Sequence, residues 1–218
     1  MLIRYLATAP AAPPNATEEA LRNASIAPKL YPRLRLPSTF AGYKIGVMAE
    51  SIVFSKAASR DTVYREIIPQ IEALVAGEPD VVANLANIAA VLKEAFGFFW
   101  VGFYLEKSGQ LVLGPFQGPL ACTRIDLDKG VCGHAYTTRE TVVVPDVEKF
   151  PGHIACSSAA RSEIVVPLFH ADGIVAGVID VDSDSLEDFG DADVAGLQAV
   201  ARIVERVIRS HTNSDRLE

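Results

Sequence analysis

The stretch that decides the fold is Ile164–Val181, which reads IVVPLFHADGIVAGVIDV. It consists of two apolar, β-branched runs, 164–169 and 173–181, on either side of the turn Ala171-Asp172-Gly173. An Asp-Gly pair between two such runs is typical of a tight hairpin turn. The stretch therefore predicts two adjacent antiparallel strands in a sheet that other elements cover.

A second hairpin is predicted earlier in the chain. Residues 98–105, FFWVGFYL, are rich in aromatic and branched side chains, and Ser108-Gly109 turns the chain into a further strand at 110–116. A short strand is expected at 141–144. The glycine-bearing segment 117–140 shows no regular period, so we expect it to be irregular.

Apolar residues recur at helical spacing in three places. The first helix is expected from about residue 59 to Gly77, bent or interrupted at Pro69, and the second begins at Pro79-Asp80. A closing helix is expected over 191–210. Helices and antiparallel hairpins in this order predict an α+β domain.

Residues 1–47 differ from the rest of the chain. They hold six of the thirteen prolines and a net charge of +4, whereas the remainder carries −11. Prolines at this density exclude a long helix or a central strand, so we expect a disordered extension outside a domain at 48–218. The alternatives are that this extension is a mitochondrial presequence or a linker, or that the true start of the protein is Met48.

Composition excludes several classes of function. The net charge of −7 and a pI near 5.2 disfavour binding to nucleic acid or to an anionic membrane surface. No stretch of 18 apolar residues appears, so no membrane span is expected. Three cysteines in 218 residues are too few for a secreted disulfide framework.

All three cysteines, Cys122, Cys132 and Cys156, lie within 35 residues of one another. A lone cysteine is most often a small buried hydrophobe, and this interpretation suits Cys132 between Val131 and Gly133. Cys156 follows Pro-Gly in a segment without strand or helix period, which favours an accessible loop thiol. Two loop thiols suggest a cycle in which one becomes a sulfenic acid and the other condenses with it to a disulfide.

Acidic residues form a second group of interest. Asp180 and Asp182 are two apart on a predicted strand, so they point to the same face, and Glu163 stands just before the preceding strand. Like charges held close together raise at least one pKa, which leaves a carboxylic acid able to donate a proton near neutrality. Alternatively, these acids are solvated at the strand ends or cap a turn.

Aromatic residues supply a third candidate feature. Trp100 and Tyr104 share a strand face with Gly102 between them, and a glycine between two rings leaves an open floor for a small ligand. A core strand is the alternative.

A zinc site is not expected. Cys132 with His134, and His153 with Cys156, offer two sulfur and two nitrogen ligands, but neither pair has the usual thiolate spacing.

Ordered blocks over residues 50–210 resemble the GAF-domain free methionine-(R)-sulfoxide reductases. The blocks are LGPFQG (113–118), AC (121–122), GVCG (130–133), VPDV (144–147), FPGHIAC (150–156), SEIVVPL (162–168) and IDVDS (179–183). The resemblance implies a six-stranded antiparallel GAF sheet and, commonly, a homodimer. It also implies reduction of free L-methionine (R)-sulfoxide by thioredoxin, with no bound cofactor. We expect a cytoplasmic location, or a mitochondrial one if residues 1–47 are a presequence.

The resemblance also implies roles for individual residues. Cys156 matches the nucleophile and Cys122 its recycling partner, whereas Cys132 matches a third cysteine whose role varies between accounts. The three acids match groups that hold the substrate and polarise the sulfoxide, and the two aromatic residues match walls around its methyl end; these are Glu163, Asp180, Asp182, Trp100 and Tyr104. A non-catalytic GAF module that senses a small molecule is the alternative, because many domains of this fold only bind ligands.

Overall fold

A single antiparallel sheet of six strands forms the centre of the protein, as the family resemblance implies. The computed structural model describes residues 51–152 and 159–214. The strand order is β3-β2-β1-β6-β5-β4, and every neighbouring pair is antiparallel. The strands are β1 Trp100–Lys107, β2 Gln110–Gln117, β3 Arg124–Asp126, β4 Val142–Val144, β5 Ser162–Phe169 and β6 Val175–Ser183.

Both predicted hairpin turns are present. Ser108 and Gly109 have φ values of +56° and +82°, so the two central residues of the β1–β2 turn are both left-handed, as tight hairpins require. Gly173 has a φ of +82° and donates its backbone N–H to the carbonyl of His170 at 3.0 Å. These turns set which residues of each hairpin face one another.

Three long helices lie at the positions that the apolar spacing predicts: α2 Arg60–Val75, α3 Val81–Phe96 and α5 Asp191–Ser214. The Asp80 side chain accepts the backbone N–H of Ala83 at 2.8 Å, which caps the start of α3. Of the bend or interruption expected at Pro69, the interruption is wrong, because α2 runs through this proline as one helix. Packing of its buried face against α3 and α5 outweighs the cost of one missing hydrogen bond.

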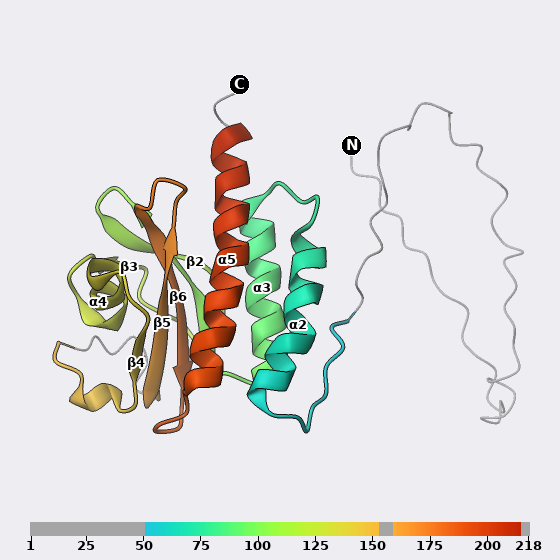
Figure 1. Cartoon of the computed structure of the whole chain (residues 1–218). Coiled ribbons are helices and arrows are strands. Elements are labelled where there is room, and N and C mark those ends of the chain that lie inside the picture. Colours follow the sequence, from blue (N-terminus) through green and yellow to red (C-terminus); the bar gives the residue numbers. More distant parts are fainter. Residues whose placement is uncertain (1–50, 153–158, 215–218) are drawn as a thin grey trace, which may run out of the picture. The chain divides into compact units, whose positions relative to one another are not determined.

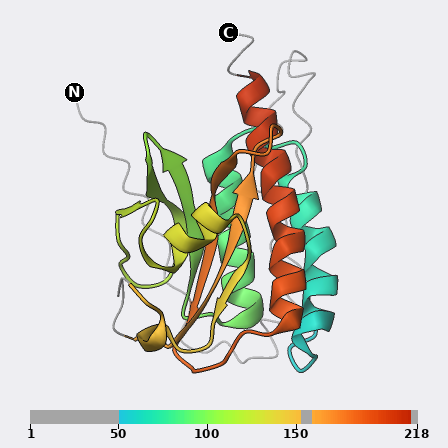
Figure 2. The same cartoon turned by 60° about the vertical axis from the view of Figure 1, so that its left-hand side comes forward.

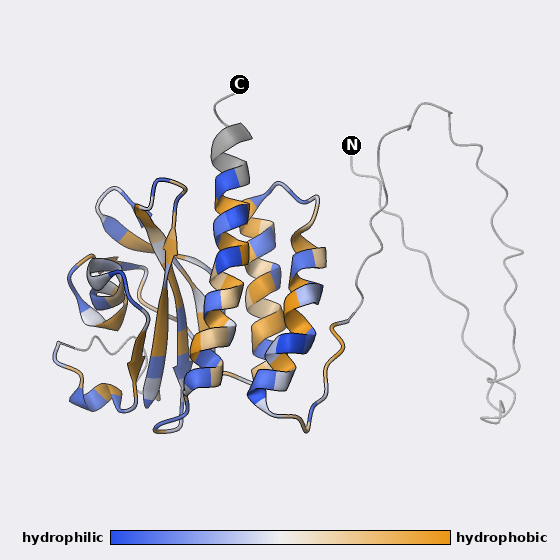
Figure 3. Cartoon of the chain, viewed as in Figure 1, coloured by the Kyte–Doolittle hydropathy of each residue, from blue (hydrophilic) through white to orange (hydrophobic). Residues whose placement is uncertain are grey.

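The sheet separates two cores. Helices α3 and α5 cover one face, with α2 packed against them, and the short helix α4, Gly130–Thr138, covers the other face (Figures 1 and 2). The larger core is almost entirely apolar and includes Ile67, Leu92 and Val204. Figure 3 shows hydrophobic residues along α3 and the strands, whereas the hairpin turns are hydrophilic. The smaller core, on the α4 side, contains Trp100, Tyr104 and Cys132.

The segment 117–140 is more regular than its sequence suggests, because it contains β3 and α4. Helix α4 has nine residues, two of them glycine, and no side chain caps its first turn. Its intrinsic helix propensity is therefore low, and packing of Val131 and Ala135 against the sheet stabilises it. A short 3-10 turn, η1 Val147–Lys149, leads from β4 towards β5.

Buried polar contacts connect the start of α2 to the start of α5. The Arg60 guanidinium donates to Asp188 Oδ1 at 2.8 Å and to Asp193 Oδ2 at 2.9 Å. The Tyr64 hydroxyl donates to the other oxygen of Asp193 at 3.2 Å. Asp193 is 2% exposed, so this ion pair links two helices far apart in sequence through a buried charge.

The extension at 1–47 lies outside the described residues, and its disorder stays a prediction. Within 51–152 and 159–214, none of the helices combines the length and apolar character needed to cross a membrane.

Candidate active site

The three predicted acids share one face of the sheet. Glu163 of β5 pairs with Asp182 of β6, and Asp182 pairs on its other side with Trp100 of β1. Asp180 lies two residues earlier on β6 and pairs with Gly102. Cross-strand partners point to the same side of a sheet, so all three carboxyls face the α4 side.

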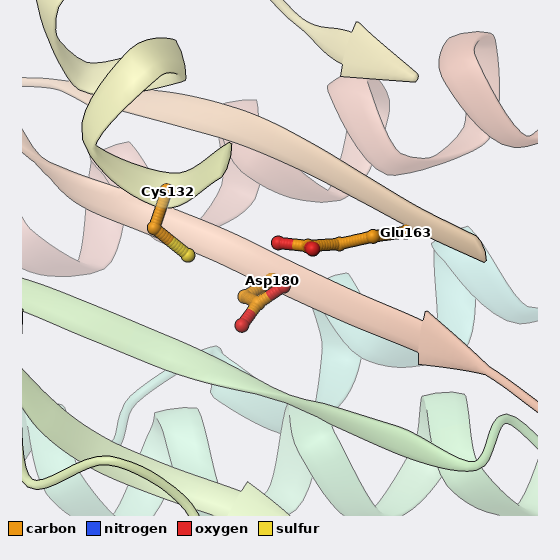
Figure 4. A group of neighbouring side chains, drawn as sticks. All are labelled: Cys132, Glu163 and Asp180. Carbon is orange, nitrogen blue, oxygen red and sulfur yellow. The ribbon is translucent and has the colours of Figure 1, made fainter. Parts of the chain in front are cut away.

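Helix α4 brings Cys132 against these acids. The sulfur of Cys132 and one carboxylate oxygen each of Glu163 and Asp180 all lie within 4.8 Å of one another, and the side chains converge below α4 (Figure 4). Cys132, Glu163 and Asp180 are 3%, 6% and 7% exposed. We call these three residues the thiol–acid cluster; Asp182 borders it and is half-buried.

Burial dominates the electrostatics of the thiol–acid cluster. It raises the pKa of Glu163 well above its usual range, and the neighbouring Asp180 and Asp182 add to this shift. Burial also raises the pKa of Asp180, to about 6, while hydrogen bonding from Cys132, Glu163 and the Val181 backbone opposes the rise. The predicted upward shifts are therefore present, and Asp180 is the acid best placed to ionise near neutrality.

The Cys132 thiol is held in its neutral form. Burial raises its pKa well above the ordinary range, and the charges of Asp180 and Glu163 raise it further. A thiol is a weak nucleophile, since the thiolate is the reactive form. Cys132 is therefore poorly suited to act as the nucleophile in this environment.

One oxygen of Asp180 has no hydrogen-bond partner. Oδ1 is buried and unpaired among the residues that the structure describes. An unpaired buried carboxylate oxygen is costly, so Oδ1 is a candidate acceptor for a donor from a ligand or a water molecule. An ammonium group or a hydroxyl are the donors that fit this position.

The aromatic residues pack together instead of framing an open floor. The ring of Trp100 stacks on Tyr104 and on Phe116, with centroid distances of 6.0 and 5.3 Å. A Cβ atom at Gly102 would lie 2.6 Å from the Trp100 ring and 2.4 Å from the Phe116 Cβ. The expected opening above Gly102 is therefore wrong, because these two side chains fill it.

The same two aromatic residues hold the segment that carries Cys122. Trp100 Nε1 donates to the carbonyl of Pro119 at 3.2 Å, and the Tyr104 hydroxyl donates to the carbonyl of Cys122 at 3.0 Å. Sequence reasoning missed these contacts, because a backbone carbonyl leaves no mark in a motif. Through them, residues on β1 fix the position of a cysteine far along the chain.

The predicted cysteines differ in state. Cys132 is a free thiol, whereas Cys122 is half-buried and disulfide-bonded. Cys156 lies outside the described residues, together with His153 and the loop amides expected to bind a substrate carboxylate. The described structure thus brings together Cys132 and the acids.

The thiol–acid cluster also has donor atoms at the spacing of a metal site, one each from Cys132, Glu163 and Asp180. His134 takes no part in this group. It is exposed, and its ring makes an edge contact with Phe150 at 5.7 Å. The Cys132–His134 pair is therefore not a preformed pair of zinc ligands.

Helix α4 is the functional element that sequence reasoning missed. A Cβ at Gly133 would lie 3.0 Å from the backbone oxygens of Asp126 and Leu127, so α4 packs closely on the loop before it. Two glycines around Cys132 are the signal that could have indicated this close approach.

The architecture is that of a GAF domain: an antiparallel six-stranded sheet has helices on one face and a buried polar site beneath a short helix on the other. The family model for the GAF domain matches residues 80–208. The chain belongs to this family, in the group that includes the free methionine-R-sulfoxide reductases.

Three relatives illustrate the similarity. The chain is 53% identical over 159 residues to GAF domain-containing protein A of Dictyostelium discoideum, covering 72% of this chain and 99% of that protein. It is 37% identical to the free methionine-R-sulfoxide reductase of Saccharomyces cerevisiae, covering 72% and 92%. The X-ray structure of free methionine-R-sulfoxide reductase from Neisseria meningitidis, in complex with its substrate, superimposes with a TM-score of 0.73 at 55% identity, covering 75% and 98%.

Proposed function

We propose that this protein reduces free L-methionine (R)-sulfoxide to L-methionine. The observation that carries the proposal is the thiol–acid cluster, in which buried carboxyls with raised pKa values lie on the same face of the sheet. The names of the yeast and Neisseria relatives support the same activity.

The acids serve two purposes in this reaction. The sulfur of a sulfoxide is a poor electrophile until its oxygen is protonated or strongly hydrogen-bonded. Glu163, whose pKa burial raises well above its usual range, supplies the hydrogen bond to the sulfoxide oxygen. Asp180, ionised above a pKa of about 6, accepts the substrate ammonium at its unpaired oxygen.

The chemical step transfers the sulfoxide oxygen to a cysteine. The Cys156 thiol attacks the sulfoxide, the S–O bond of the substrate breaks, and methionine leaves a sulfenic acid on Cys156. The Cys122 thiol then condenses with this sulfenic acid, forming a disulfide and releasing water. Thioredoxin, as external dithiol, reduces the disulfide and becomes oxidised, which restores both thiols.

Cys156 is the better candidate nucleophile of the two possibilities. Cys132 is buried and its pKa is raised, so its thiolate is scarce. Pairing of Cys156 with Cys122 also agrees with the disulfide-bonded state of Cys122 and the free thiol of Cys132.

The activity is tested by incubating the reduced protein with each epimer of free methionine sulfoxide and with a peptide containing the sulfoxide. We expect methionine to form from the free (R) epimer alone, in a first turnover without reductant and in many turnovers with thioredoxin. Cys156→Ser should abolish the first turnover, while Cys122→Ser should keep it and lose recycling. Full activity in Cys156→Ser, with loss in Cys132→Ser, would reverse the assignment.

A sensing module is the alternative function. It predicts that free methionine sulfoxide binds unchanged, with no methionine released by the reduced protein. A homodimer, from the family resemblance, and a cytoplasmic location are further proposals. Light scattering of the purified chain and fractionation of the native cell test them.

A further inference from the structure

The loop that carries Cys122 presents a large apolar side chain to solvent. Leu120, two residues before Cys122, is 89% exposed, the highest value for a large hydrophobic residue in the described part of the chain; Val53 follows at 74%. Single exposed hydrophobic residues are common on protein surfaces, so exposure alone indicates no function. Leu120 differs because the backbone on both sides of it is fixed and a disulfide-bonded cysteine follows it.

Buried aromatic residues of β1 fix this loop before and after Leu120. On one side, Trp100 Nε1 donates to the carbonyl of Pro119 at 3.2 Å, and a Cβ at Gly118 would lie 2.5 Å from the Trp100 ring. On the other side, the Tyr104 hydroxyl donates to the carbonyl of Cys122 at 3.0 Å. Trp100 and Tyr104 are 3% and 1% exposed, so a rigid core holds Leu120 in solvent.

We propose that Leu120 is a docking contact for the protein dithiol, of the thioredoxin class, that reduces the disulfide of Cys122. This inference rests on the proposed function, since it concerns the recycling step of that reaction. A thiolate of the reductant attacks one sulfur of the disulfide, the S–S bond breaks, and a mixed disulfide forms. The second thiol of the reductant then displaces the protein, so the reductant leaves oxidised and the protein regains two thiols.

The position of Cys122 determines what its reductant touches. Cys122 is half-buried, whereas Pro119 and Leu120 are exposed. A sulfur of the partner can reach the disulfide only if the surface around that sulfur lies against the neighbouring chain. Residues 117–123 carry no charge, so the complementary surface of the partner is an apolar one.

The rigid loop makes Leu120 an efficient contact. Its side chain is almost fully hydrated in the free protein, so a partner that covers it gains nearly the whole hydrophobic contribution of a leucine. The anchored carbonyls of Pro119 and Cys122 mean that little backbone entropy is lost when the partner docks. A small dithiol has no surface to place on Leu120, and this difference between reductants provides the test.

The experiment measures reduction of the disulfide form, prepared with diamide, in the absence of methionine sulfoxide. Thioredoxin and dithiothreitol are compared as reductants, and the second-order rate constant of each is obtained by thiol trapping. The variants are Leu120→Ser, which removes the apolar contact, and Leu120→Met, which keeps it. Ile174→Ser is the matched control, because Ile174 is 60% exposed and lies in the β5–β6 turn.

We expect Leu120→Ser to lower the rate constant with thioredoxin roughly tenfold, the size expected when a contact loses one aliphatic side chain. The rate constant with dithiothreitol should stay at the wild-type value. Leu120→Met should return the thioredoxin rate towards wild type, and Ile174→Ser should leave both rates unchanged. The first turnover of methionine formation should be normal in all three variants.

Four outcomes overturn the inference. They are an unchanged thioredoxin rate in Leu120→Ser, an equal loss with both reductants, no reduction of the wild-type disulfide by thioredoxin, and a change of oligomeric state in Leu120→Ser by light scattering. The last would mean that a second copy of this chain covers Leu120. Because these rates need no substrate, a selective loss in Leu120→Ser without methionine formation by wild type would refute the proposed function and leave the docking contact standing.

Discussion

Glu163 and Asp182 are direct register partners on β5 and β6, so two carboxyls lie side by side on the α4 face of the sheet. Their neighbour Asp180 points to the same face two residues away. These three acids destabilise the folded state when they ionise, because burial disfavours their charge and like charges repel. The chemistry of the site therefore has a measurable effect on stability.

The stability of the protein should fall as the pH rises through the range of these acids. The folded-state pKa of Asp180, about 6, lies above its unfolded value, so the folded protein holds more protons and loses stability from about pH 4 to above pH 6. Asp180→Asn should flatten this fall by up to about 3 kcal/mol. The free energy of unfolding in urea, measured at several pH values for both proteins, tests this prediction.

The control for that experiment is Asp128→Asn. The Asp128 side chain is 71% exposed and pairs with Lys129 at the surface, so its replacement should leave the pH dependence of unfolding as in wild type. Equal slopes for wild type and Asp180→Asn would contradict the burial of charge in the thiol–acid cluster.

The buried ion pair between α2 and α5 should contribute strongly to stability. Asp193→Ala leaves the Tyr64 hydroxyl without its acceptor and removes one of the two carboxylates that pair with Arg60, which should lower the free energy of unfolding by about 2–3 kcal/mol. Asp61→Ala breaks an exposed pair with Arg65 and should cost under about 1 kcal/mol. A similar loss for both variants in urea unfolding would show that burial has no effect here.

Crowding beneath α4 should reduce activity more than stability. In Gly133→Ala the new Cβ meets two backbone oxygens at 3.0 Å, so the helix and Cys132 must shift by a few tenths of an ångström. Better helix propensity offsets the crowding, so unfolding should change by no more than about 1 kcal/mol. We expect kcat/KM to fall several-fold.

The matched substitution is Gly190→Ala, where a Cβ has nothing within 4 Å. Its kinetic parameters should equal those of wild type. Unchanged kcat/KM in Gly133→Ala would mean that the position of α4 is unimportant for turnover.

The Tyr104 hydroxyl should matter for recycling and not for the first turnover. Tyr104→Phe keeps the ring but loses the 3.0 Å hydrogen bond to the Cys122 carbonyl, so the segment that carries Cys122 is held less firmly. The rate of methionine formation in one turnover should stay near wild type, while disulfide formation slows several-fold. Rapid quenching with a thiol-trapping reagent separates the two steps.

Tyr136→Phe, on α4, is the control for that variant, since Tyr136 is half-buried and remote from Cys122 in the chain. A slower first turnover in Tyr104→Phe, with normal disulfide formation, would instead place the hydroxyl in the substrate step.

The parts of the fold that sequence predicts are those that local chemistry decides. The Ser108-Gly109 and Asp172-Gly173 turns, and the Asp80 cap of α3, depend on a few neighbouring residues. Helix α4 depends instead on contacts with the sheet, and its weak helix propensity gave no signal for a helix in the sequence. The interruption expected at Pro69 is absent for the same reason, because tertiary packing keeps α2 continuous.

In the candidate site, too, local sequence predicts some features while others depend on tertiary contacts. The period of a strand predicts that Asp180 and Asp182 share a face, and the structure confirms it. The position of Cys132 against Glu163 could not be predicted, because it depends on how a short helix crosses the sheet. Likewise, no pattern in the sequence indicates that Trp100 and Phe116 fill the space above Gly102.

The separation of the two cores by the sheet has a consequence for engineering. The α2, α3 and α5 face holds most of the apolar core, while the chemical groups stand on the opposite face. A library of variants restricted to the α4 face would change the chemical groups of the site while leaving the larger of the two cores intact.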